Sequence, residues 1–411
     1  MLGCLAGILL AICAHLIDDN DLFGDTTLPG EVLIIGKDTV RSLLSTIAGA
    51  TATMMSLTYT LTLLIFTLAA GQLGPRLLDS FYDNRMNQVA IAIMSATFVF
   101  MLVAIFLLTE GQGASVTGII AIMLAVLSVG TLIYFVHDVA QRVLVDNEIA
   151  LTAKRLRATI AGAFRERDNA TQPVEAMPDR DAGPARIIHC SDTGYLRSID
   201  IDELVQYLAK TDGTVEILVA PGEYLIQRMP VAIVRRAGSV EDWEKTINER
   251  LVLGRSRSSE GDLLFLVNLL VEIALRALSP GVNDSFTAVS AIDHLSGAFG
   301  DMLQRTPASP LYQDEDGVVR VMASVLTVDQ ILDTALNPIR RNAAGNMLVS
   351  CTIIDAIRRM IEVSDAEYIP LLRHHADLVG RTALPADAAE EDRQHLATRL
   401  LTVLPDGATP A

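Results

Sequence analysis

No acidic or basic side chain interrupts VAIAIMSATFVFMLVAIFLL at residues 89–108 or SVTGIIAIMLAVLSVGTLIYFV at residues 115–136. The hydrocarbon core of a bilayer is about 30 Å thick, and a helix of about 20 apolar residues spans it. A helix also satisfies its backbone hydrogen bonds internally, which the membrane interior requires. Both stretches therefore predict membrane-spanning helices.

Two more apolar stretches precede them, at residues 1–17 and 43–70, and neither contains Asp, Glu, Lys or Arg. The first has no basic residue before its apolar run and no small-x-small site before Asp18, which favours a retained helix over a cleaved signal. We therefore expect a transmembrane domain over residues 1–140 with four spans, at about 1–17, 43–70, 89–108 and 115–136.

The composition agrees with a membrane protein and excludes other classes. Of the 411 residues, 51% are hydrophobic, and the mean hydropathy is +0.38. The net charge of -17 argues against nucleic acid as a partner, because phosphate binding needs concentrated Lys and Arg. The four cysteines lie far apart without a CxxC pair, so neither a disulfide framework nor a zinc site is expected.

Lys and Arg in short loops indicate which side of a membrane each loop faces. Residues 18–42 contain six acids against Lys37 and Arg41, whereas the loop after the second span carries Arg76 and Arg85. Basic residues recur after the fourth span, at Arg142, Lys154, Arg155, Arg157, Arg165 and Arg167. This distribution predicts a multi-pass protein with both termini, and all of the chain beyond the fourth span, in the cytoplasm.

The second span is rich in hydroxyl groups with a seven-residue period. Small and hydroxyl side chains follow one helix face, at Thr46, Gly49, Thr53, Ser56, Thr60 and Thr67. Such a face is expected to contact protein or water. One interpretation is close helix packing, in which small residues let backbones approach. The other is a pore wall, in which hydroxyl oxygens replace part of an ion's hydration shell.

The chain beyond the spans divides by composition into three parts. Residues 141–184 continue the fourth span as an amphipathic helix and end in a linker that contains Pro173 and Pro178. Residues 185–237 alternate short β-like runs with one helix and predict a small α+β module. Residues 238–411 are expected to be mainly helical. The fold class is thus a polytopic α-helical membrane protein with a cytoplasmic α+β and mainly α-helical C-terminal region.

A helical hairpin is predicted over residues 263–303, because Ser279-Pro280-Gly281 ends one apolar helix and Asn283 or Asp284 caps the next. Polar residues are unusually dense around this hairpin, and buried charges must pair. They are expected to form either a structural network or a ligand pocket: Arg257, Asp262, Glu272, Arg276, Asn283, Asp284 and Asp293.

The run IALRALSPGVND at residues 273–284, followed by FTA at 286–288, resembles the signature of the DUF2254 family of uncharacterised bacterial membrane proteins. Supporting runs lie at residues 43–49, 72–78 and 128–137. The sequence departs from the family pattern at Ser285, where proline is usual, and at Glu260, where glutamine is usual. The resemblance implies a protein of the bacterial inner (plasma) membrane with four spans and a cytoplasmic domain. It implies no settled activity.

No enzyme motif accompanies these features: the Walker, GxGxxG, GxSxG and HExxH patterns are absent. His374 and His375 with Asp377 make a poor chelate, because adjacent side chains on a helix point about 100° apart. We therefore expect no catalytic residue, no metal site and no cofactor.

Two functional hypotheses follow. The first is an oligomeric inner-membrane channel or ion-conducting pore, with the hydroxyl-rich second span lining the path and the cytoplasmic domain regulating it. The second is a membrane-anchored ligand sensor or enzyme with a site around Arg276, Asn283 and Asp284. The expected partners are membrane lipid, further copies of the chain, and either ions or a small ligand.

Overall fold

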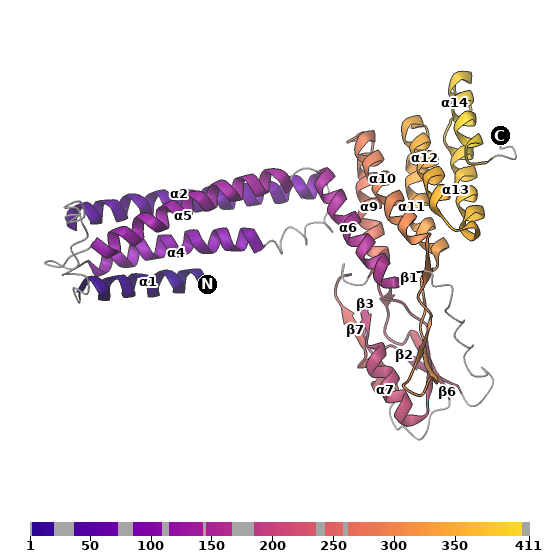
Figure 1. The fold of residues 1–411 in the computed structure, drawn as a ribbon, viewed down its shortest axis with the longest axis horizontal. Coiled ribbons are helices and arrows are strands. Elements are labelled where there is room, and N and C mark those ends of the chain that lie inside the picture. Colours follow the sequence, from indigo (N-terminus) through magenta and orange to yellow (C-terminus); the bar gives the residue numbers. More distant parts are fainter. Residues whose placement is uncertain are drawn as a thin grey trace. The chain divides into compact units, whose positions relative to one another are not determined.

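The computed structural model describes residues 2–19, 37–72, 85–108, 115–142, 145–166, 185–235, 243–257 and 262–404 (Figure 1). The chain divides into two compact units, residues 1–147 and 148–411, and each is considered by itself. We call them the N-terminal unit and the C-terminal unit.

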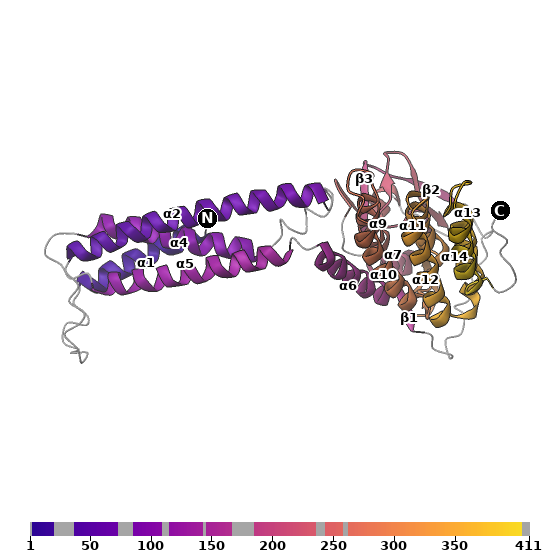
Figure 2. The same ribbon diagram turned by 90° about the horizontal axis from the view of Figure 1, so that it is seen from above.

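The N-terminal unit contains α1 (Leu2–Asp19), α2 (Lys37–Gln72), α4 (Arg85–Leu107) and α5 (Ser115–Arg142). These four helices lie side by side in both views (Figures 1 and 2). All four are long and apolar enough to cross a membrane, as the sequence predicted. Leu44, Phe100 and Met101 are fully buried among them. Helices α1 and α4 approach so closely that a Cβ added at Gly7 would overlap the carbonyl of Ala96.

The C-terminal unit begins in α6 (Val145–Ala163), which follows α5 after two residues. The sequence predicted one amphipathic helix leading from the fourth span. The structure describes α5 as far as Arg142 and α6 from Val145; residues 143–144 lie outside the described ranges, and β1 (Phe164–Glu166) follows α6 directly. The expected linker around Pro173 and Pro178 lies outside the described residues.

Strands and one helix follow where the sequence predicted an α+β module: β2 (Arg186–His189), β3 (Gly194–Ile199), α7 (Ile201–Thr211), β4 (Thr214–Ile217), β5 (Tyr224–Leu225) and β6 (Pro230–Arg235). Asp200 caps α7 by accepting a hydrogen bond from the amide of Glu203 at 3.0 Å. The short α8 (Trp243–Asn248) then packs against this part of the chain, with Trp243 buried in the same apolar core as Leu208.

The sheets do not stop at the expected boundary between residues 237 and 238. The strands β7 (Leu251–Gly254), β8 (Arg305–Pro307), β9 (Leu311–Gln313) and β10 (Val319–Met322) come from the stretch expected to be mainly helical. The main sheet has the order β2-β6-β4-β10-β9, and β10 pairs in parallel with β4. A second sheet has the order β5-β3-β7, and β1 pairs with β8. The two expected modules therefore share their sheets.

The rest of the C-terminal unit is a helical array, which Figure 1 shows beside the strands of the same unit. It consists of α9 (Leu263–Ala277), α10 (Ser285–Met302), α11 (Val328–Asn342), α12 (Met347–Val363), the 3-10 turn η2 (Ala366–Tyr368), α13 (Ile369–Thr382) and α14 (Glu390–Leu401). Helices α9 and α10 form the predicted hairpin. Each has a buried apolar face, which includes Leu270 on α9 and Phe299 on α10.

Candidate functional site

The periodic hydroxyl residues of α2 occupy one outward face of the N-terminal unit. We call this set the hydroxyl face, and all of its members are exposed in the single chain: Thr46, Gly49, Thr53, Ser56, Thr60 and Thr67. The opposite side of α2 carries Leu44, Thr51 and Thr58, which are buried against the other helices. Within the described part of its own chain, α2 therefore packs through the side opposite the hydroxyl face.

Each threonine on the hydroxyl face donates its hydroxyl hydrogen to the carbonyl one turn earlier in α2. The donor–acceptor distances are 2.8 Å for Thr46, 3.0 Å for Thr53 and 2.9 Å for both Thr60 and Thr67. A hydroxyl has one donor and two acceptor lone pairs. The lone pairs of these four threonines thus stay available on the outer surface of the unit.

Other hydroxyl groups lie between the packed helices of the N-terminal unit. The Ser128 hydroxyl of α5 donates to Thr97 of α4 at 2.9 Å, and Thr58 of α2 contacts the sulfur of Met94 at 3.5 Å. All of these side chains are fully buried. The sequence does not mark Thr97 or Ser128 as packing residues, because an isolated hydroxyl in an apolar span shows no period.

The turn between α9 and α10 is built as a helix cap. Asp284 accepts from the amide of Thr287 at 3.2 Å and from its hydroxyl at 2.6 Å. These bonds, the hydroxyl bond foremost, lower the pKa of the Asp284 carboxyl below its ordinary value. Asn283 has a left-handed backbone with φ of 50°, which asparagine tolerates. Both residues are exposed, and of the two it is Asp284 that caps α10.

The other polar residues of the hairpin lie elsewhere. At the start of α9, Asp262 accepts from the amide of Phe265 at 2.9 Å and pairs with Arg257 at 2.8 Å. Because α9 has 15 residues, about 22 Å separates this pair from the α9–α10 turn. Asp293 of α10 pairs with Arg359 of α12. Glu272 and Arg276 are half-buried on α9. The seven residues therefore do not form a single ligand pocket.

The two adjacent histidines of α13 lie in different surroundings. His375 is buried and His374 is exposed, while Asp377 pairs with Arg381 at 2.7 Å. Among the residues that the structure describes, no group of three or more His, Cys, Asp or Glu is arranged to hold a metal ion.

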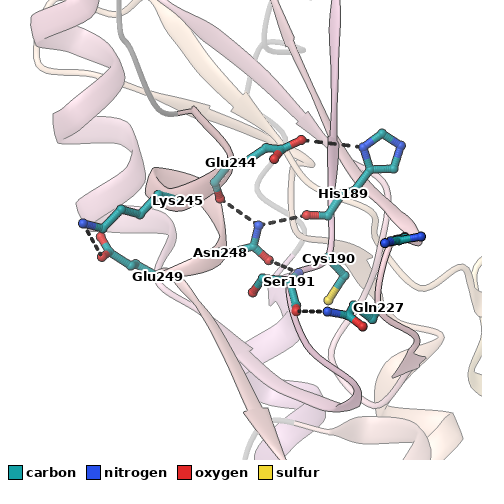
Figure 3. A pocket seen from close by; sticks show the side chains of 9 residues that line it. His189, Cys190, Ser191, Gln227, Glu244, Lys245, Asn248 and Glu249 are labelled. Carbon is teal, nitrogen blue, oxygen red and sulfur yellow. Dashed lines mark hydrogen bonds and ion pairs between the residues drawn. The ribbon is translucent and has the colours of Figure 1, made fainter.

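A pocket that the sequence did not indicate lies in the C-terminal unit between the end of β2, the 226–229 loop and α8 (Figure 3). We call it the Arg228 pocket. Its volume is about 650 Å³, and it is lined by His189, Cys190, Ser191, Gln227, Arg228, Glu244, Lys245, Asn248 and Glu249. This volume is in the range of small-molecule sites, roughly 300 to 1,000 Å³.

Asn248 fixes the shape of the Arg228 pocket. Its side-chain oxygen accepts from the amide of Ser191 at 2.8 Å, and its nitrogen donates to the carbonyls of His189 at 2.9 Å and Glu244 at 2.7 Å. Gln227 donates to the carbonyl of Ser191 at 3.2 Å, and Figure 3 draws these hydrogen bonds as dashed lines. Ser191 and His189 are 57 and 59 residues from Asn248 in the chain, and Gln227 is 36 residues from Ser191, so no local pattern signals the pocket.

The comparisons with known proteins agree with the membrane architecture. A family model described as "Predicted membrane protein (DUF2254)" matches residues 1–359. An uncharacterized protein of Mycobacterium tuberculosis (strain ATCC 25618 / H37Rv) is 26% identical over 368 residues, which cover 86% of this chain and 70% of that protein. An uncharacterized protein of Mycobacterium bovis matches with the same identity and coverage. No solved structure matches.

Proposed function

The chain belongs to the DUF2254 family of predicted membrane proteins, and on this premise we propose that several copies assemble into a channel whose path is lined by α2. The observation that supports this proposal is the exposure of the whole hydroxyl face on a helix long and apolar enough to cross a membrane. A face of hydroxyls and glycine favours protein or water over lipid tails. In the assembly this face therefore contacts other copies of the chain and a water-filled path.

The oxygen lone pairs of the hydroxyl face make it suited to cations. Thr46, Thr53 and Thr60 are spaced by seven residues, or about 10 Å along a helix. A ring of copies would place the threonine oxygens in successive layers around the path. Such oxygens replace water ligands of a cation, and because each hydroxyl hydrogen is already bonded to a carbonyl, none is directed at an anion.

The proposal includes an orientation in the bacterial inner membrane. The acidic 18–42 loop is placed outside, and Arg76, Arg85 and the C-terminal unit are placed in the cytoplasm, because basic loops stay on that side. In this arrangement the C-terminal unit regulates the path. Only residues 143–144 separate α5 from α6. A movement of α6 can therefore be transmitted to the last span through this short connection.

Planar-bilayer recording of the purified full-length protein tests the proposal. Thr53→Leu and Thr60→Leu should each lower the cation conductance, because leucine removes the oxygen and narrows the path. The matched control is Thr131→Leu on α5, whose hydroxyl also donates to a carbonyl one turn earlier, at 2.7 Å. Unchanged conductance in both α2 variants would place the path elsewhere, and no conductance in the wild type would exclude a channel.

A further inference from the structure

Arg228 has an unusual backbone conformation. Its φ is 72°, and the other non-glycine residues with positive φ in the described chain are Asp212 and Asn283. Asp and Asn tolerate this region because a short polar side chain bonds locally, whereas a long side chain there is uncommon. Non-glycine residues held in such conformations cluster at active sites and ligand clamps.

Three backbone hydrogen bonds hold the turn at Arg228. Its amide donates to the carbonyl of Cys190 at 2.8 Å, the amide of Cys190 donates to Met229 at 2.8 Å, and the amide of Met229 donates to Ile226 at 2.9 Å. Glycine would adopt the same φ without steric strain. The backbone alone therefore does not require arginine here, and the side chain needs its own explanation.

The Arg228 side chain lines the Arg228 pocket, and among the described residues it has no hydrogen-bond or ion-pair partner of its own. The two acids of the pocket lie beside other side chains: Glu244 is 3.8 Å from the imidazole of His189, and Glu249 is 3.9 Å from the ammonium group of Lys245. The guanidinium of Arg228 thus remains available to a ligand. A planar guanidinium binds carboxylate or phosphate through two parallel hydrogen bonds.

We propose that the Arg228 pocket binds a small soluble organic anion, whose carboxylate or phosphate pairs with Arg228. The carboxylates of Glu244 and Glu249 would repel a ligand that was anionic throughout, so its remaining part carries hydroxyl or amino donors for them. The Asn248 hydrogen bonds keep the walls in place before the ligand arrives, which lowers the entropy cost of binding. This site is independent of the proposed channel.

Calorimetric titration of the detergent-solubilised full-length protein tests the site, with glycerate and glycerol phosphate as the two probes, because one carries a carboxylate, the other a phosphate, and both carry hydroxyl donors. We expect saturable binding of at least one of them, and the tighter probe identifies the preferred group. Arg228→Gly should weaken this binding by about tenfold or more, since it removes a charge-assisted pair. The same variant should unfold at an unchanged or higher temperature, because glycine relieves the backbone strain.

Asn283→Gly is the matched control, since it places glycine at another left-handed position, in the α9–α10 turn. It should bind the probe as the wild type does. The proposal is overturned if neither probe binds saturably, if Arg228→Gly binds as tightly as the wild type, or if Asn283→Gly loses the same affinity. Competition by phosphatidylglycerol added to the micelles would also overturn it, because the ligand would then be a lipid phosphate.

Discussion

His375 is a buried titratable group in the helical array. Its side chain is 1% exposed, and within the described chain neither ring nitrogen makes a hydrogen bond. A carboxylate oxygen of Asp333 on α11 lies 3.7 Å from Nε2. Burial lowers the pKa of His375 below its ordinary value; Asp333 and Asp329 oppose this shift, and His374 and Arg340 add to it. Folding therefore disfavours the protonated form of this imidazole.

The lowered pKa predicts that the C-terminal unit loses stability on acidification. As the pH falls through the ordinary histidine range, the unfolded chain takes up a proton that folded His375 resists, so the free energy of unfolding decreases. The loss should begin below about pH 7 and contribute at most about 1.4 kcal/mol per pH unit. Hydrogen exchange of α13 in the full-length protein between pH 7 and pH 5 measures it.

The neighbouring histidine provides the control for this prediction. His375→Gln should remove most of the pH dependence, because glutamine does not titrate. His374→Gln should preserve it, because His374 is exposed. Equal pH profiles for the wild type and His375→Gln would show that another group causes the effect.

At the scale of the helices, the start of α5 depends on a residue of α1. Asp18 accepts from the amides of Val116 and Thr117, both at 3.0 Å, and from the Thr117 hydroxyl at 2.6 Å. The first amides of a helix have no partner within it. A carboxylate also interacts favourably with the positive end of the helix dipole. Asp18 thus ties the first candidate span to the fourth.

Removing this carboxylate should destabilise the N-terminal unit. We expect Asp18→Ala to cost about 1 to 3 kcal/mol, because it leaves part-buried donors without a partner. Asp18→Asn should cost less, since its amide oxygen still accepts a hydrogen bond. Thermal unfolding of the solubilised protein measures both. In a double-mutant cycle with Thr117→Val, additive effects would indicate that the two residues do not act together.

The sequence was sufficient to predict elements whose signals are local. The candidate spans follow from apolar length, and the α9–α10 hairpin follows from Ser279-Pro280-Gly281 and the cap at Asp284. The place of β10 in the main sheet was not predictable, because it pairs with β4 about 100 residues earlier and its four residues show no clear period. The Asp18 contact with α5 and the walls of the Arg228 pocket are likewise long-range.

The candidate site was predictable only where its signal in the sequence is local. The seven-residue period identified the hydroxyl face, and the structure places all of its members on one exposed side of α2. The polar set around the hairpin was defined by composition alone. Arg257 with Asp262, and Asp293 with Arg359, form separate pairs because their helices bring different partners to each residue.

At the scale of the whole molecule, the proposed orientation predicts which segments are reachable from outside the cell. Cysteines introduced at Asp25 and Asp181 in a background without the native cysteines should label from opposite sides. Both positions lie outside the described residues. In intact cells an impermeant reagent should modify Asp25→Cys alone, and Asp181→Cys should react only after permeabilisation. Modification of both in intact cells would contradict the orientation.

Assembly through α2 is the central claim, and cross-linking in native membranes tests it most directly. With Cys4, Cys13, Cys190 and Cys351 replaced by serine, Thr53→Cys on the hydroxyl face should form disulfides between copies under mild oxidation. Thr131→Cys on α5 serves as the control and should yield far less dimer. Efficient cross-linking at Thr53→Cys alone is the predicted result. A monomer at Thr53→Cys, or equal cross-linking at both positions, would contradict assembly through the hydroxyl face.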